Sequence, residues 1–190
     1  MTIYKNCGNV PFEFAACIGF FDGVHRGHQF LLRHLQEEAS RRGLKSAVVT
    51  FANHPRKLIQ PDYDLLLIDT LEQRLEKLAA TGIDACFLLD FTEEIRQLSA
   101  REFIQDVLSK QMHVRLLIIG YDHRFGHDRS DSFEDYVRYG KECGMEVIQE
   151  PVFTDDSGLH FSSSEVRRAL KSGDVDKARR ILGQIENKKE

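Results

Sequence analysis

The sequence predicts an α/β fold in which a parallel sheet carries helices on both faces. Short apolar runs alternate along the chain with segments whose apolar residues recur at helical spacing, as in successive β-α-β units. Several runs are almost continuously apolar, which is typical of strands covered on both sides. We therefore expect a five-stranded parallel sheet, with strands at 14–20, 44–51, 83–89, 114–120 and 145–149.

The segments between these runs read as helices that pack on the sheet. One helix is predicted to end near Gly43 and another near Gly82, because glycine adopts the left-handed conformation that closes many helices. Capping boxes, in which a hydroxyl residue is followed three positions later by Glu or Gln, predict further helix starts at Thr70, Ser99 and Ser162.

Composition and charge indicate a soluble globular protein. The chain has 190 residues, enough for one substantial domain, with 42% hydrophobic and 29% charged residues. No apolar run approaches the ~20 residues that a membrane span needs, so we expect no membrane association. A formal net charge of −4 argues against nucleic acid as a partner, because neutralising many phosphates requires a basic face.

Cysteine usage and the start of the chain suggest the cytoplasm. The cysteines are far apart and form no CxxC pair, so packing thiols are expected rather than disulfides or zinc ligands. The first residues lack the basic region and apolar stretch of a secretory signal. We expect a cytoplasmic protein without a protein-held metal centre. The cysteines are Cys7, Cys17, Cys86 and Cys143.

The most informative motif is the run 18–28, Ile-Gly-Phe-Phe-Asp-Gly-Val-His-Arg-Gly-His, between the first strand and the first helix. Its three glycines let the backbone turn tightly and approach a ligand, and the positive end of the helix points at the same place. His25 and His28 are three residues apart and should share one face of the first turn. These features indicate a polyphosphate site, although a glycine-rich turn whose histidines only cap the helix is an alternative.

Other unusual residues follow other predicted strands. The loops 50–57 and 120–129 should reach the same carboxyl edge of the sheet, where open α/β folds bind ligands. The second of these loops reads as a binding flap, or as an ordinary polar loop with Phe125 as a packing anchor. Near the end, 161–168 puts hydroxyls, free amides and arginines at a helix start, which suits a phosphate or is simply a capping box.

Together these segments resemble the N-terminal FMN adenylyltransferase (FAD synthetase) domain of bacterial bifunctional riboflavin kinase/FAD synthetases, a branch of the HxGH nucleotidylyltransferase superfamily. The resemblance runs from about residue 14 to about 183 and rests on four motifs in the family's order, at 19–28, 50–55, 120–126 and 162–167. It implies the Rossmann-like HxGH fold, with a domain at 1–185, a polar tail at 186–190 and no riboflavin kinase domain in this chain.

The resemblance implies transfer of AMP from ATP to FMN, giving FAD and pyrophosphate, with Mg²⁺ carried mainly by the ATP phosphates. It implies catalytic roles for four residues: His25, His28, Ser164 and Arg167. Further ATP contacts are assigned to Gly19, Phe20, Phe21, Asp22, Gly27, Ser162 and Ser163. Asn53, Asp122 and Phe125 are assigned to FMN.

The chain departs from the family at two motif positions and leaves other functions open. Phe20 stands where the family often has Asn, and Ser164 where it commonly has Thr. One alternative is an HxGH nucleotidylyltransferase with another phosphorylated acceptor; a second is a non-catalytic flavin- or nucleotide-binding module. A metal hydrolase using His25, His28 and His54 is disfavoured, because there is no HExxH pattern and no evident carboxylate ligand nearby.

Overall fold

The computed structural model describes most of the chain. The described residues are 1–5, 10–60, 66–121, 123–127, 129–151, 153–154, 158 and 160–183, with only the backbone described at 57 and 59. Their elements, in chain order, are β1 (Thr2–Lys5), β2 (Phe14–Ile18), η1 (Asp22–Val24), α1 (Arg26–Arg42), β3 (Lys45–Phe51), α2 (Pro55–Ile59), α3 (Leu71–Ala80), β4 (Ala85–Leu89), α4 (Glu93–Gln97), α5 (Ala100–Glu102), η2 (Phe103–Gln111), β5 (Val114–Gly120), α6 (Phe133–Glu142), β6 (Glu146–Glu150), α7 (Ser163–Lys171) and α8 (Val175–Leu182).

The predicted α/β fold is confirmed, but the sheet has six strands rather than five. The strands lie in the order β1-β4-β3-β2-β5-β6, and all neighbouring pairs are parallel. The additional strand is β1, a four-residue edge strand that pairs only with β4. Only Tyr4 is partly buried, where its ring stacks on Phe87 at 5.2 Å between centroids. So short and exposed a strand lacks the apolar run by which the other strands were predicted.

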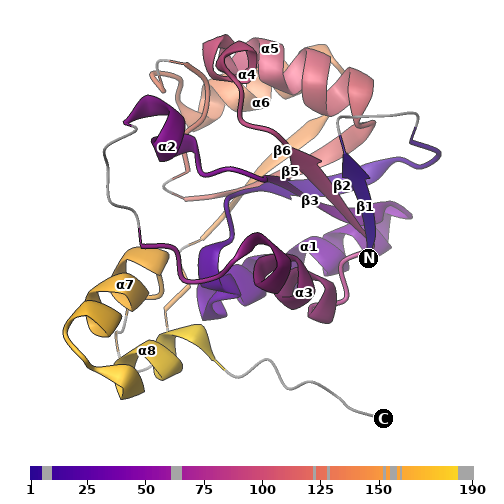
Figure 1. The fold of residues 1–190 in the computed structure, drawn as a ribbon. Helices are drawn as coiled ribbons and strands as arrows, with labels where there is room; N and C mark the ends of the chain where they lie inside the picture. The colour runs from indigo at the N-terminus through magenta and orange to yellow at the C-terminus, as the bar shows by residue number, and fades with distance from the viewer. Residues whose placement is uncertain are drawn as a thin grey trace.

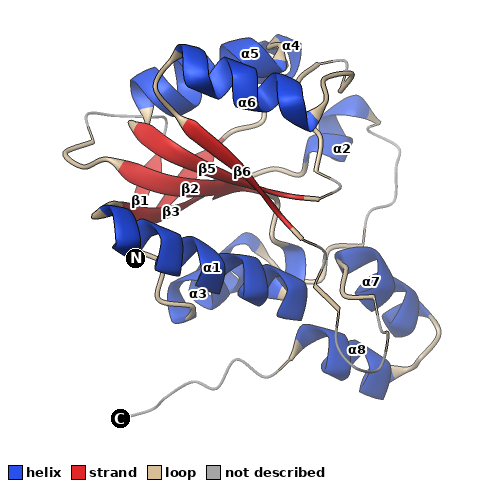
Figure 2. Cartoon of the chain, turned by 180° about the vertical axis from the view of Figure 1, so that it is seen from behind, coloured by secondary structure: helices blue, strands red, loops and turns tan. Residues whose placement is uncertain are grey.

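Helices cover both faces of the sheet, as Figures 1 and 2 show. On one face, α1 and α3 bury side chains such as Leu35 and Leu78 against Cys17 and Cys86. On the other, α5, η2 and α6 pack around Phe14 and Phe87. Both cysteines are free thiols, and burial raises the pKa of Cys86 to about 12, so they serve as small apolar packing groups.

The predicted helix boundaries agree closely with the structure. α1 ends at Gly43, whose left-handed conformation lets its N–H reach the carbonyls of Ala39 and Ser40. Reciprocal capping boxes start α3 at Thr70 and α5 at Ser99. At α7, however, only the Ser162 hydroxyl accepts a bond, because the partner carboxylate of the expected box turns to basic side chains instead.

Helices α7 and α8 lie to one side of the sandwich, beside the carboxyl ends of the strands (Figure 1). They enclose a small apolar cluster of their own, which includes Phe161, Val166 and Ile181. Within the described residues, no helix combines the length and the apolar character needed to cross a membrane.

Candidate functional site

The turn that links β2 to α1 is tightly wound. Phe21, Gly23 and Val24 have φ values of 57°, 82° and 41°, all in the left-handed region. A Cβ at Gly23 would lie 2.9 Å from a methyl carbon of Leu182, so the turn also needs a glycine for close contact with α8. A run of left-handed residues costs conformational energy and persists only where the surrounding packing holds it. The turn is therefore a rigid, preformed part of the site.

The two histidines of the turn stack on each other. Their ring centroids are 3.6 Å apart with the planes 20° from parallel, and the ring of Phe21 makes an edge-type contact with His28 at 5.1 Å between centroids. His25 is the N-cap of α1, and its Nδ1 accepts a hydrogen bond from the backbone N–H of His28 at 3.3 Å. His25 thus lies beside His28, as expected, and it also caps α1, as in the alternative interpretation.

Burial keeps both imidazoles neutral. It lowers the pKa of His25 to about 4, despite the opposing attraction of Asp22. It lowers the pKa of His28 well below its usual value, and the neighbouring His25 ring adds to this effect. Because Nδ1 of His25 accepts a hydrogen bond, the neutral ring carries its proton on Nε2. His25 therefore presents an N–H donor from a fixed tautomer.

Asp22 connects the turn to the C-terminal helices. It is 2% exposed, and its carboxylate accepts bonds from the backbone N–H groups of Ile68 and Asp69. Its Oδ2 also pairs with the guanidinium of Arg167 at 2.6 Å, and its backbone carbonyl accepts the Ser163 hydroxyl at 2.9 Å. The structure thus gives Asp22 a structural task, which is to hold α7 and the 68–69 backbone against the histidine turn.

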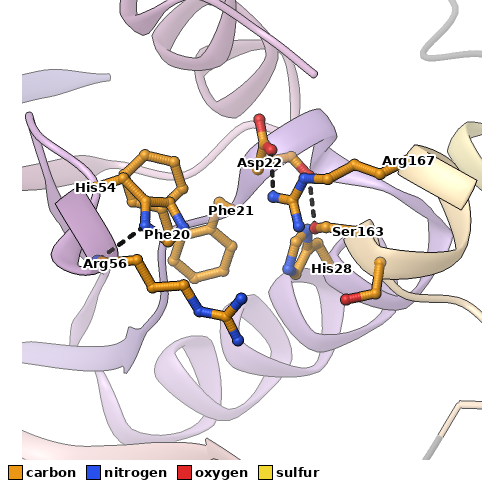
Figure 3. A pocket seen from close by; sticks show the side chains of 9 residues that line it. Phe20, Phe21, Asp22, His28, His54, Arg56, Ser163 and Arg167 are labelled. Carbon is orange, nitrogen blue, oxygen red and sulfur yellow. Dashed lines mark hydrogen bonds and ion pairs between the residues drawn. The ribbon is translucent and has the colours of Figure 1, made fainter. Parts of the chain in front are cut away.

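Two cavities meet at this turn. The smaller, of about 280 Å³, is polar and includes Arg56, Ser164 and Arg167 in its lining, and Figure 3 shows the two guanidinium groups approaching it from different sides. The larger, of about 640 Å³, is bounded by aromatic and apolar side chains, including Phe30 and Phe153. Four residues line both cavities: Phe20, Phe21, His28 and Ser163.

Most of the predicted nucleotide residues gather here. Gly19, His25, Gly27 and Ser162 line the larger cavity, and Asp22 lines the smaller. These residues come from the β2–α1 turn and the start of α7, which are more than 130 positions apart in the chain. A Cβ at Gly27 would lie 3.1 Å from the carbonyl oxygen of Phe161, so this glycine permits the two segments to approach.

The residues assigned to FMN do not gather in the same way. The side-chain amide of Asn53 donates through Nδ2 to the Phe91 carbonyl and accepts the Phe91 N–H at Oδ1, which ties the loops after β3 and β4 together. Phe125 stacks on Tyr136 at 4.5 Å and packs against the core, as in the packing-anchor alternative. Neither side chain lines the two cavities. Asp122 lies outside the described residues.

Three further residues lie at the site but were not assigned to nucleotide binding from the sequence. His54 and Arg56 line the smaller cavity from the start of α2, and burial lowers the pKa of His54 to about 4. Arg74, which is 1% exposed, lies 3.9 Å from the centre of the Phe20 ring and donates to the backbone carbonyls of Phe20 and Phe51. The His-Pro-Arg run was a visible signal for the first two. Arg74 sits in an ordinary helical pattern and gave none.

Comparison with known proteins identifies the family of the chain. Residues 10–165 match the FAD synthetase family. The chain is 36% identical to the bifunctional riboflavin kinase/FMN adenylyltransferase of Escherichia coli K12 over 166 residues, covering 87% of this chain and 53% of that protein. It is 35% identical to the protein of the same description from Pseudomonas fluorescens over 186 residues, covering 96% and 59%. The chain thus spans a little over half the length of these relatives.

Solved structures show the same fold. A structure described as a macrolide-efflux protein from Streptococcus pneumoniae superposes with a TM-score of 0.84 at 30% identity, over 96% of this chain and 60% of that one. Pantoate-beta-alanine ligase from Francisella tularensis superposes with a TM-score of 0.54 at 17% identity, over 96% and 78%. The second likeness concerns the fold alone. Because the family model matches residues 10–165, which are most of this chain, the chain belongs to the FAD synthetase family.

Proposed function

We propose that this protein is an FMN adenylyltransferase, which transfers AMP from ATP to FMN and releases pyrophosphate. The observation that carries the proposal is the junction of the two cavities at His28 and Ser163, where residues from the β2–α1 turn and from the start of α7 meet. Membership of the FAD synthetase family supports the choice of substrates.

The two cavities suit the two halves of ATP. The larger one offers aromatic walls for a nucleoside, since it is lined by Phe30 and Phe153, whose ring centroids are 5.0 Å apart. The smaller one offers the guanidinium groups of Arg56 and Arg167 and the hydroxyls of Ser163 and Ser164, which suit phosphate oxygens. We therefore place the nucleoside in the larger cavity and the β- and γ-phosphates in the smaller.

In this arrangement the α-phosphorus lies at the junction, beside the histidine turn. An oxygen of the FMN phosphate forms the new bond to this phosphorus, and the bond to the bridging oxygen of pyrophosphate breaks. The nucleophile is already an anion, so no general base is required. His25 and His28 are neutral donors at the N-terminus of α1, and they would stabilise charge that grows on the phosphate oxygens.

Arg167 would act from a fixed position. Its guanidinium is paired with Asp22, and its Nε donates to the backbone carbonyl of Leu66 at 2.9 Å, so two contacts set its direction before substrate binds. Preorganised donors of this kind lose little freedom when the anion arrives. The Ser163 hydroxyl is held in a similar way by the Asp22 carbonyl.

We infer that Mg²⁺ enters with the nucleotide. Both oxygens of Asp22, the carboxylate of the turn, are bound to the N–H groups of Ile68 and Asp69 and to Arg167, which leaves Asp22 an outer-shell role at most. Substrate phosphates and water are common ligands for this hard cation, which would neutralise charge on the triphosphate.

For FMN we propose the side of the site formed by the loops after β3 and β5. Asn53, Asp122 and Phe125 remain candidates for contacts to the flavin or its ribityl chain, and such contacts would require Asn53 or Phe125 to leave its present partner. His54 and Arg56, which follow Asn53 in the chain, face the smaller cavity and therefore belong to the side of the site proposed for the ATP phosphates.

The test is direct. The purified protein is incubated with ATP, Mg²⁺ and FMN, and FAD and pyrophosphate are quantified by chromatography and a coupled assay. We expect the two products in equal amounts, and no FAD when α,β-methylene-ATP replaces ATP. Failure to form FAD would overturn the proposal, and a dinucleotide formed instead from nicotinamide mononucleotide would favour another phosphorylated acceptor.

A further inference from the structure

Glu150 is an unexpected carboxylate in the wall of the larger cavity. It is the last residue of β6, lies in register with Gly120 of β5, and is 4% exposed. A cavity proposed to hold a nucleotide would not be expected to include a buried negative charge close to the phosphates. The position of Glu150 within the sheet resolves this conflict.

The sheet places Glu150 far from the phosphate end of the site. The larger cavity extends over the ends of β2, β5 and β6, where it is lined by Gly19, Gly120 and Glu150. Neighbouring strands lie about 4.8 Å apart, so β6 is roughly 10 Å from β2 and its histidine turn. Apart from its chain neighbours, no described residue has an atom within 4 Å of a Cβ built at Gly120, so the space beside this cavity-lining position is open.

The carboxylate of Glu150 is held in one orientation by α1. Its Oε2 accepts a hydrogen bond from Nδ1 of His34, whose other nitrogen lies 3.6 Å from a carboxylate oxygen of Glu38. Glu38 is in turn paired with Arg41 and Arg42. Among the residues that the structure describes, the second oxygen of Glu150 has no hydrogen-bond donor, so it can accept a bond from a molecule in the cavity.

We propose that Glu150 is a specificity-determining residue that accepts a hydrogen bond from the 6-amino group of the adenine base. In a nucleotide the ribose separates the base from the phosphates. A carboxylate two strands away from the histidine turn is therefore better placed to contact the base than the phosphates. A carboxylate has only lone pairs to offer. It would favour the amino group of adenine and reject guanine, which presents a carbonyl oxygen at the same position.

His34 is the positioning residue in this arrangement. It fixes one oxygen of Glu150 from α1 and thereby leaves the other for the base. The inference rests on the adenylyl transfer proposed above, because it assigns the nucleoside to the larger cavity. It adds which chemical group of the nucleoside is recognised, and by which residue.

The first test uses the unmodified protein. With FMN and Mg²⁺ held saturating, kcat/KM is measured for ATP, GTP and purine riboside triphosphate, which lacks the 6-amino group. We expect ATP to be preferred by about 10- to 100-fold over the purine analogue, and by more over GTP. Equal values for ATP and the purine analogue would overturn the inference while leaving FAD formation established. Absence of a flavin dinucleotide product with every nucleotide, including FAD with ATP, would instead defeat the proposed function.

The second test uses Glu150→Gln, because an amide can donate to the carbonyl of guanine as well as accept from adenine. We expect the ratio of kcat/KM for ATP to that for GTP to fall at least 10-fold, mainly through KM for the nucleotides. Calorimetry with α,β-methylene-ATP and its guanine counterpart should show the same change in the ratio of Kd values. An unchanged ratio, or an effect confined to KM for FMN, would contradict the assignment.

Glu146→Gln is the matched control. Glu146 also lies on β6 and also contacts α1, through its ion pair with Arg42, but it is exposed and lines neither cavity at the histidine turn. It should keep the wild-type selectivity. His34→Asn, whose amide can still donate near the position of Nδ1, should lie between Glu150→Gln and the wild type in selectivity. If Glu150 only linked α1 to β6, the Glu146 and Glu150 variants would show the same selectivity between ATP and GTP.

Discussion

At the scale of single residues, the site depends on groups that carry two tasks. His25 caps α1 through Nδ1, and this bond leaves Nε2 as the proton-bearing donor. Asp22 holds Arg167 and the 68–69 backbone, and so it sets the direction of a guanidinium in the smaller cavity. Because the structural bonds of His25 and Asp22 also orient the His25 N–H and the Arg167 guanidinium, these donors are in place before any anion binds.

His28→Ala should lower kcat for FAD formation by about 10²-fold or more. The imidazole lines both cavities, and removing one preorganised donor from a developing negative charge has an effect of this size in other enzymes. The control is His113→Asn, because His113 precedes β5 at the opposite end of the sheet and asparagine tolerates its positive φ. An unchanged kcat with only a raised KM for ATP would contradict the role given to His28.

The lowered pKa of His25 predicts a pH dependence of stability. Between pH 6.5 and about pH 4 the unfolded chain binds a proton at this residue and the folded protein does not. Protonation therefore favours the unfolded state, and the free energy of unfolding should fall as the pH is lowered through this range. For one histidine the slope reaches about 1.4 kcal/mol per pH unit, and it disappears below pH 4, where both states are protonated.

His25→Asn isolates this contribution, because asparagine keeps an N-cap oxygen but does not titrate. Chemical denaturation between pH 4 and 7.5 should give a shallower dependence for the variant than for the wild type. Parallel curves would show that His25 is not the group responsible. The measurement concerns stability alone and does not depend on the catalytic role of the residue.

At the scale of elements, the carboxyl ends of β2 and β3 are joined by one buried arginine. Arg74 of α3 donates to the carbonyls of Phe20 and Phe51 and to the Thr50 hydroxyl, and desolvation lowers its pKa. Its guanidinium also packs on the ring of Phe20, which His54 contacts as well. The strand ends beneath the site are thus held by α3, which contributes no residue to the smaller or the larger cavity.

Arg74→Leu should lower the free energy of unfolding by about 2–4 kcal/mol, because it leaves buried acceptors without their donor. Urea denaturation measures the change. The matched control is Arg101→Leu, since Arg101 is an exposed arginine whose ion pair with Glu142 should contribute less than about 1 kcal/mol. Comparable losses in the two variants would show that the buried bonds of Arg74 add no more than a surface pair.

The same elements explain what could be predicted from the sequence. The four inner strands were visible because they are covered on both faces and so are largely apolar, whereas β1 is an exposed edge of four residues. The other edge strand, β6, is less apolar but keeps the buried Val147 and the partly buried Ile148. The histidine turn and the start of α7 were visible because they gather glycines, imidazoles and hydroxyls at the ends of elements. Arg74 and Glu150 were not, since each is a single charge in a common pattern whose significance comes from partners distant in the chain.

The FMN residues illustrate a different limit. Asn53 and Phe125 occur in loops at the expected edge of the sheet, which the sequence located correctly. In the structure their side chains bind Phe91 and Tyr136, and nothing in the local sequence distinguishes these partners from a ligand. Loop position can be inferred from topology, but the direction of a loop side chain depends on contacts that topology does not specify.

At the scale of the whole molecule, the residues that the structure describes form a large two-sided core and a small third cluster. The third cluster belongs to α7 and α8 and includes Val166 and Ile181. Polar links connect it to the histidine turn and to α1, among them the Asp22–Arg167 pair and the bonds from Gln29 to the carbonyls of Val24 and Leu182. A small core joined to a larger one in this way should open more readily than the sheet.

A bound polyphosphate would bridge the two parts, because the start of α1 belongs to the large core and the start of α7 to the small cluster. Binding should therefore protect the amides of α7 and α8 from hydrogen exchange more than those of β2 and β5, which are already buried. Exchange measured by mass spectrometry, with and without α,β-methylene-ATP and Mg²⁺, tests this. Asp22→Asn should raise exchange in α7 in the absence of nucleotide, because it weakens the link to Arg167. If nucleotide protected β2 and β5 as much as α7, the two cores would form one cooperative unit and the bridging role would be excluded.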